Sequence, residues 1–63
     1  MNEIELRIYR QNLLDIIRCL SKSFDACEKY DLVEASDHLQ SAQFWMSTLK
    51  NRLIVKRDED NQS

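Results

Sequence analysis

The sequence predicts an all-α fold, an antiparallel two-helix hairpin that dimerises into a four-helix bundle. Apolar residues recur at helical spacing along two segments, residues 3–28 and 32–56. Each segment starts with a residue pair typical of a helix N-terminus. Glycine and proline are both absent, which disfavours a β-rich fold with several tight turns. The 63 residues therefore predict one small helical domain.

The first predicted helix spans about residues 3–28. Asn2 is a good N-cap residue, and Glu5 follows three positions later, as in a capping box. The apolar residues beyond it fall within roughly 100° of a helical wheel, the width of a core-facing stripe. They are Leu6, Tyr9, Leu13, Ile16, Ile17, Leu20, Phe24 and Cys27.

A turn at about residues 29–31 is predicted from a second capping box. Asp31 is an N-cap residue and Glu34 follows it by three positions. The alternative is one continuous helix of about 55 residues.

The second predicted helix, about residues 32–56, has the strongest pattern in the chain. Its apolar residues are spaced 3, 4, 3, 4, 3 and 4, which is an unbroken heptad row. They are Leu32, Ala35, Leu39, Ala42, Met46, Leu49 and Leu53. Such a row needs a partner to cover it. Residues 57–63 contain no apolar residue and are predicted to form a disordered tail.

Small size and unpaired cysteines favour a homodimer. A chain this short buries only roughly 60% of its unfolded surface, and burial barely offsets chain entropy. Cys19 and Cys27 lie about 12 Å apart on one helix, too far for a disulfide. A second hairpin would close a four-helix bundle. The expected dimer and core residues are Leu13, Ile16, Ile17, Leu20, Phe24, Leu32, Leu39, Ala42, Met46, Leu49 and Leu53. A monomer docked on another protein and an intertwined dimer remain open.

The far side of the second helix is a candidate partner surface. Val33, Phe44 and Val55 are eleven residues apart and align opposite the heptad row, with Trp45 beside it. Exposed aromatic residues often mark contact surfaces. The plainer interpretation is that Trp45 covers the rim of the bundle and that Phe44 is an isolated surface residue.

A candidate basic face runs along the first helix through Arg7, Arg18, Lys22 and Lys29. Such a stripe can follow a phosphate backbone. Asp15 and Asp25 interrupt it at ion-pairing distances from Arg18 and Lys29. A solvated, ion-paired face explains the pattern better, and the net charge of −2 disfavours nucleic acid as a partner.

The residues predict no enzyme, metal or cofactor. One histidine and no Cys-x-x-Cys motif disfavour zinc, and no phosphate-binding loop forms without glycine. No local histidine activates either cysteine. No apolar run is long enough to span a membrane and no secretory signal is visible. Unpaired cysteines and no signal indicate a reducing, cytoplasmic setting.

Two resemblances extend these expectations. The length and layout are similar to the Rop-type RNA-binding hairpins of plasmids, although Arg7, Gln11 and Arg18 do not reproduce that family's contact pattern. The stretch of residues 5–20, ELRIYRQNLLDIIRCL, resembles the small early proteins of the exo–xis region of lambdoid phages, with a length matching a 63-residue member. That resemblance implies a helical, dimeric early protein of a bacteriophage. It would act by protein–protein contacts during phage development in the host cytoplasm. The alternative function is a Rop-like bundle that binds nucleic acid through the basic face.

Overall fold

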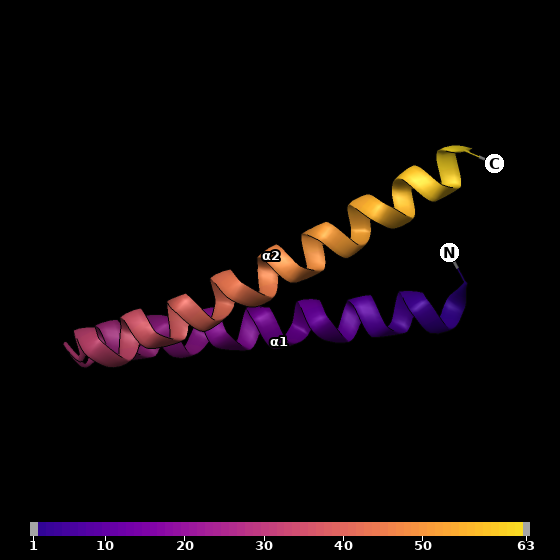
Figure 1. The fold of residues 1–63 in the computed structure, drawn as a ribbon. Coiled ribbons are helices and arrows are strands. Elements are labelled where there is room, and N and C mark those ends of the chain that lie inside the picture. Colours follow the sequence, from indigo (N-terminus) through magenta and orange to yellow (C-terminus); the bar gives the residue numbers. More distant parts are fainter. Residues whose placement is uncertain (1, 63) are drawn as a thin grey trace.

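The protein is a hairpin of two long α-helices in the computed structural model, which describes residues 2–62. Helix α1 spans Glu3–Glu28 and helix α2 spans Leu32–Gln62. The two helices run side by side from the turn and diverge toward their far ends (Figure 1). The described chain measures 50 × 17 × 10 Å, and its radius of gyration is 14.8 Å, against about 11 Å for a compact domain of this length. A single hairpin is therefore extended rather than compact.

Both predicted capping boxes supply a side-chain cap. The Asn2 Oδ1 atom accepts a 2.8 Å hydrogen bond from the Glu5 backbone N–H. The Asp31 Oδ1 atom accepts a 3.0 Å bond from the Glu34 backbone N–H. Each cap satisfies a backbone donor that has no partner within its helix. The chain is thus two capped helices, and the alternative of one continuous helix is excluded.

The turn between the helices is a Schellman motif built without glycine. The Asp31 N–H donates to the Ala26 carbonyl at 2.9 Å, and the Tyr30 N–H donates to the Cys27 carbonyl at 3.0 Å. Tyr30 adopts φ 60°, the left-handed conformation that a residue with a Cβ atom occupies at a cost of about 1–2 kcal/mol. Asp31 both ends α1 and caps α2, so the connection takes only three residues.

The C-terminal end differs from the sequence prediction. The predicted helix ended near residue 56 with a disordered tail at 57–63, whereas α2 continues to Gln62, and Ser63 lies outside the described residues. Nothing in the tail stops a helix, because it contains neither glycine nor proline. Local charge pairing also supports the extra turns, since Lys56 Nζ lies 3.5 Å from Glu59 Oε2.

The contact between the helices, here called the hairpin seam, has few large apolar residues. Its buried members are Ile16, Ala26, Ala35, Ala42 and Leu49. On α1 the half-buried residues Tyr9, Asn12, Cys19 and Ser23 fall on the same face as Ile16 and Ala26, at spacings of four and three. The Ser23 hydroxyl donates a 2.8 Å hydrogen bond across the seam to the Ala35 carbonyl. Small and polar side chains thus let the helices approach closely near the turn.

Candidate functional site

The heptad row on α2 divides into two sets in the structure. Ala35, Ala42 and Leu49 are buried in the seam against α1, and Leu53 is half-buried. Leu32, Leu39 and Met46 are exposed in the single hairpin, Leu39 at 52%. Within one hairpin, then, the large residues Leu32, Leu39 and Met46 stay outside the core, whereas Leu49 belongs to it. The reason is geometric, because one neighbouring helix covers a narrower arc than a seven-residue row presents.

The stripe on α1 behaves in the same way. Ile16 is buried in the seam, while Leu6, Leu13, Ile17, Leu20 and Phe24 are exposed. The most exposed of them is Phe24, at 63%. These five residues and the exposed Leu32, Leu39 and Met46 of α2 are here called the apolar side of the hairpin.

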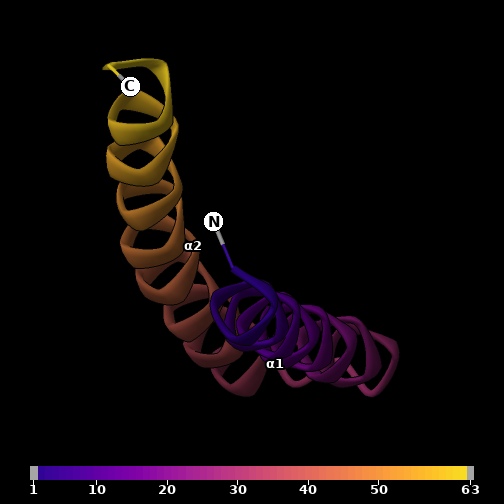
Figure 2. The same cartoon turned by 90° about the vertical axis from the view of Figure 1, so that its right-hand side faces the viewer.

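Leu13 and Met46 of the apolar side meet at a groove between the helices. The groove has a volume of about 340 Å³ and is lined by Leu13, Ile16, Met46, Leu49, Lys50, Leu53, Ile54 and Arg57. Its lining residues belong to the half of the hairpin in which the two helices diverge, and Figure 2 shows that divergence of the ribbons. Because Leu13 of α1 and Met46 of α2 both line this groove, the exposed apolar rows of the two helices lie on the same side of the hairpin. The opposite side is different, with a 110 Å³ pocket lined by Asn12, Asp15, Trp45, Thr48 and Arg52.

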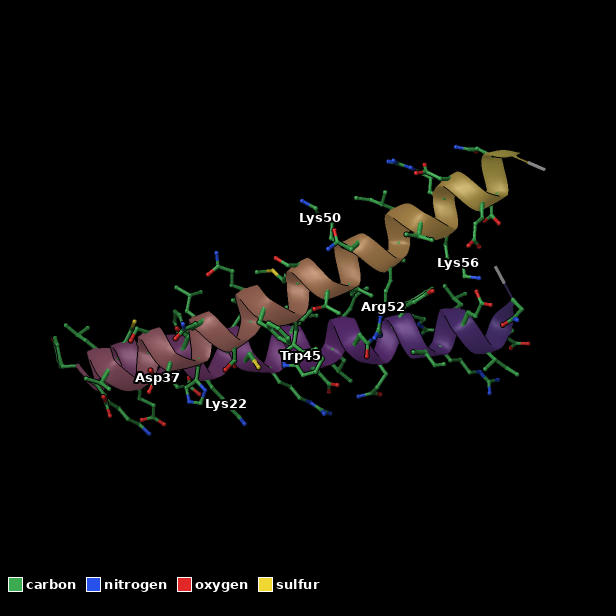
Figure 3. The ribbon with its side chains drawn as sticks, viewed as in Figure 1. Lys22, Asp37, Trp45, Lys50, Arg52 and Lys56 are labelled. Carbon is green, nitrogen blue, oxygen red and sulfur yellow. The ribbon has the colours of Figure 1, made fainter. Side chains whose placement is uncertain are left out.

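The diverging ends are bridged by an ion pair that the sequence pattern did not reveal. Lys56 Nζ on α2 lies 3.2 Å from Glu5 Oε2 on α1, and Lys56 points back toward α1 in Figure 3. The hydrogen bond and charge of Glu5, followed by the charge of Glu59, raise the pKa of Lys56 above its ordinary value. Sequence reasoning had assigned Glu5 only to the helix cap. The face of α1 that meets α2 has a spacing signal of its own, because its residues are spaced alternately by four and three. They are Glu5, Tyr9, Asn12, Ile16, Cys19, Ser23 and Ala26.

The predicted partner surface is exposed but does not form one continuous patch. Val33, Phe44 and Val55 are exposed on α2, away from the seam. Trp45 is 51% exposed and lines the polar pocket beside Asn12 and Asp15 of α1. The Phe44 and Trp45 rings meet edge to face with centroids 5.3 Å apart. The two aromatic residues therefore form the compact part of this surface.

Half of the predicted basic face is neutralised by its neighbours. Arg7 lies 3.3 Å from Glu3 and Arg18 lies 3.7 Å from Asp15. The predicted pair of Asp25 with Lys29 does not form, and Lys22 and Lys29 have no ion-pair partner within residues 2–62. They share a polar depression with Asp25, Glu34 and His38, so the face carries both signs of charge.

Neither a metal cluster nor a membrane span is present in the part of the chain that the structure describes. No three His, Cys, Asp or Glu side chains among residues 2–62 group closely enough to hold a metal ion. Over the same residues, neither helix combines the length and apolar character needed to cross a bilayer. Cys19 is half-buried in the seam and Cys27 is exposed, both as free thiols.

Comparison with known proteins gave no match to a protein family, to a curated protein or to a solved structure. The apolar side, the groove and the Phe44–Trp45 pair are the features of this chain that could bind a partner.

Proposed function

We propose that the chain is a non-enzymatic interaction protein that works as a homodimer, in which two hairpins bury their apolar sides against each other in a four-helix bundle. The observation that carries this proposal is the apolar side itself. Eight large side chains from both helices gather there and are exposed in a single hairpin, whereas monomeric proteins rarely expose a contiguous apolar patch of this kind.

Surface area supports a partner for the apolar side. The hairpin has 5252 Å² of accessible surface. A compact monomer of 7.5 kDa would have about 4,200 Å². The excess of about 1,000 Å² is close to the roughly 800 Å² that each partner buries in a standard interface.

The core of one hairpin also supports a second copy. Among residues 2–61, its buried apolar residues are only Ile16, Leu49 and three alanines, which is little for an independent fold. The apolar side repeats along α2 with a period of seven residues, at Leu32, Leu39 and Met46. That period is the one on which helices pack side by side. In a two-fold dimer both copies would contribute this same row of residues to the interface.

We further propose that the dimer acts by contacting a host or phage protein through the Phe44–Trp45 pair. Support comes from the exposure of both rings and from the frequency of aromatic anchors at interfaces. The resemblance to early phage proteins supports a role during phage development, and the free thiols support a reducing cytoplasm. Nucleic-acid binding through Lys22 and Lys29 is the rival function.

Light scattering across a dilution series tests the dimer. The expected mass is twice the 7.5 kDa of the chain. Leu39→Asp should give a monomer or an unfolded chain, because it places a charge within the apolar side. Val33→Asp is the matched control on the same helix, and it should remain a dimer. A wild-type monomer at all concentrations would refute the proposal.

The partner surface is tested with Phe44→Ser, and Ile8→Ser on α1 is the control. A partner purified and identified with the wild-type chain should bind Phe44→Ser about 30-fold or more weakly, as expected for an interface hot spot, while dimerisation is unchanged. Equal affinity of both variants would refute the Phe44–Trp45 site. Binding of nucleic acid at about 50 mM salt that weakens steeply as salt is added would favour the rival function.

A further inference from the structure

The apolar side of the hairpin is not uniform along its length. Near the turn the seam is closed by Ala26 and Ala35, and large residues stand out from it, chiefly Phe24 and Leu32. In the other half the helices diverge (Figures 1 and 2) and leave the 340 Å³ groove between Leu13, Met46 and Leu53. One half of the molecule therefore presents projecting side chains, and the other half presents a concave apolar surface.

We propose that the two copies pack with their turns at opposite ends, so that Phe24 and Leu32 of each copy fill the groove of the other. This inference rests on the proposed homodimer and specifies how its interface is built. The contact would occur twice, because a two-fold axis perpendicular to the helices exchanges the projecting half and the concave half of the two hairpins.

The register of the helices agrees with one such axis. Glu5 lies opposite Lys56 and Ser23 lies opposite Ala35, which sets the levels of the two helices. Leu13 in the groove and Phe24 in the projecting half are eleven residues apart, about 16 Å along α1. Their midpoint, at residues 18–19, is level with about residues 40–41 of α2 by these two pairs. The axis thus lies over the apolar side at this level, close to the seam residue Ala42.

Charges beside the apolar side of α1 fit the same axis. Glu28 follows Phe24 by four residues and Arg10 precedes Leu13 by three, so both flank the exposed row. Neither has an ion-pair partner within residues 2–62. An axis at residues 18–19 brings Glu28 of one copy level with Arg10 of the partner copy. The dimer would therefore contain two interchain ion pairs, each between Arg10 of one copy and Glu28 of the other.

The alternative two-fold arrangement, with both turns at one end, fits less well. It stacks α1 of one copy on α2 of the other at equal levels. Phe24 then meets the partner's projecting half, and the two concave halves face each other. Arg10 also becomes level with the partner's Lys50, a pair of like charges, and Lys50 points outward from α2 in Figure 3.

Interchain disulfides distinguish the two arrangements. Single-cysteine chains are made in a Cys19→Ala/Cys27→Ala background whose dimeric mass is first checked by light scattering. Arg10→Cys mixed with Glu28→Cys and oxidised should give a covalent dimer, since a disulfide requires Cα atoms within about 7 Å. Glu28→Cys alone should not, because its two copies lie about 28 Å apart along the bundle. A covalent dimer from Arg10→Cys mixed with Lys50→Cys instead would overturn this arrangement and leave the homodimer standing.

A charge exchange tests the same contact without cysteine. Arg10→Glu and Glu28→Arg should each weaken the dimer about 2- to 30-fold, from two exposed ion pairs per dimer, and the double variant should restore the wild-type dissociation constant. Weakening that adds in the double variant would overturn the Arg10–Glu28 contact. A wild-type chain that never dimerises would overturn the proposed function itself, so the two failures are distinguishable.

Discussion

The hairpin seam and the apolar side differ in the size of the residues they use. The seam pairs α1 with α2 through alanines, a serine and a few larger residues, so the helices meet closely near the turn but bury little surface. The apolar side holds the larger leucines, Ile17, Phe24 and Met46, and leaves them exposed in a single hairpin. The difference indicates that the seam residues determine the shape of the hairpin, whereas the residues of the apolar side offer most of the surface whose burial could stabilise it. The seam defines which faces meet, whereas most of the available burial lies outside it.

Truncation on the apolar side should have the largest effect. Leu39→Ala and Met46→Ala are each expected to cost about 2–5 kcal/mol per chain, the cost of truncating a buried core residue, because a second copy covers both side chains in the proposed dimer. The measurement is urea denaturation at a chain concentration where light scattering gives a dimer. Leu49→Ala, already buried in the seam, is the reference. A cost below about 0.5 kcal/mol, typical of a surface residue, would mean that the apolar side stays exposed in solution.

Enlarging the seam should have the next largest effect. Ala42→Leu is expected to destabilise the chain by about 1–3 kcal/mol, because a fully packed site has no room for three more carbons. Thermal denaturation followed by circular dichroism measures the loss. The control is Gln40→Leu, an exposed site on the same helix, which should change stability by less than about 0.5 kcal/mol. Equal effects at both sites would contradict a closely packed seam.

The turn offers a change that alters neither surface. Tyr30→Gly should stabilise the protein by about 1 kcal/mol, because glycine adopts the left-handed conformation without a Cβ clash. The melting temperature should rise by roughly 4–8 °C, with no change in the dimer dissociation constant. A lower melting temperature would show that the Tyr30 ring contributes more through contacts than its backbone conformation costs.

The smallest expected effect concerns the ion pair at the open end. A raised pKa means that folded Lys56 holds its proton more tightly than unfolded Lys56. The pair therefore stabilises the fold below pH 10.5, and this contribution is lost as the pH rises further. Lys56→Met should lose less stability than the wild type between neutral and alkaline pH. Lys50→Met, which removes a lysine without an ion pair within residues 2–62, should follow the wild type.

The helices, their caps and the turn could be predicted from the sequence because they depend on local rules. Asn2 and Asp31 are recognisable caps, and the expected first helix, about 3–28, corresponds to Glu3–Glu28 in the structure. Nothing local marked the end of α2, since charged residues 57–62 are compatible with both a helix and a tail. Tyr30 in a left-handed conformation was also hidden, because glycine is the usual signal for that position.

The division of the heptad row could not be predicted because it depends on how many neighbours each helix has. Heptad spacing places Ala35 and Leu39 on one stripe but does not say which of them meets α1. In the structure the small residues Ala35 and Ala42 of α2 pack against α1, whereas Leu39 and Met46 are exposed. The polar residues of the seam were also not predicted, because a search for apolar periodicity does not find Asn12 and Ser23.

The double role of Asp31 has a consequence for how this chain tolerates insertions. Because Asp31 completes the end of α1 and caps α2 at once, the turn contains no spare residue that could absorb a change in length. A residue added at the start of α2, within the helix, would rotate the rest of α2 by about 100° relative to the turn. Met46 would then no longer line the groove beside Leu13. The length of the turn therefore determines which face of α2 lies beside the apolar residues of α1.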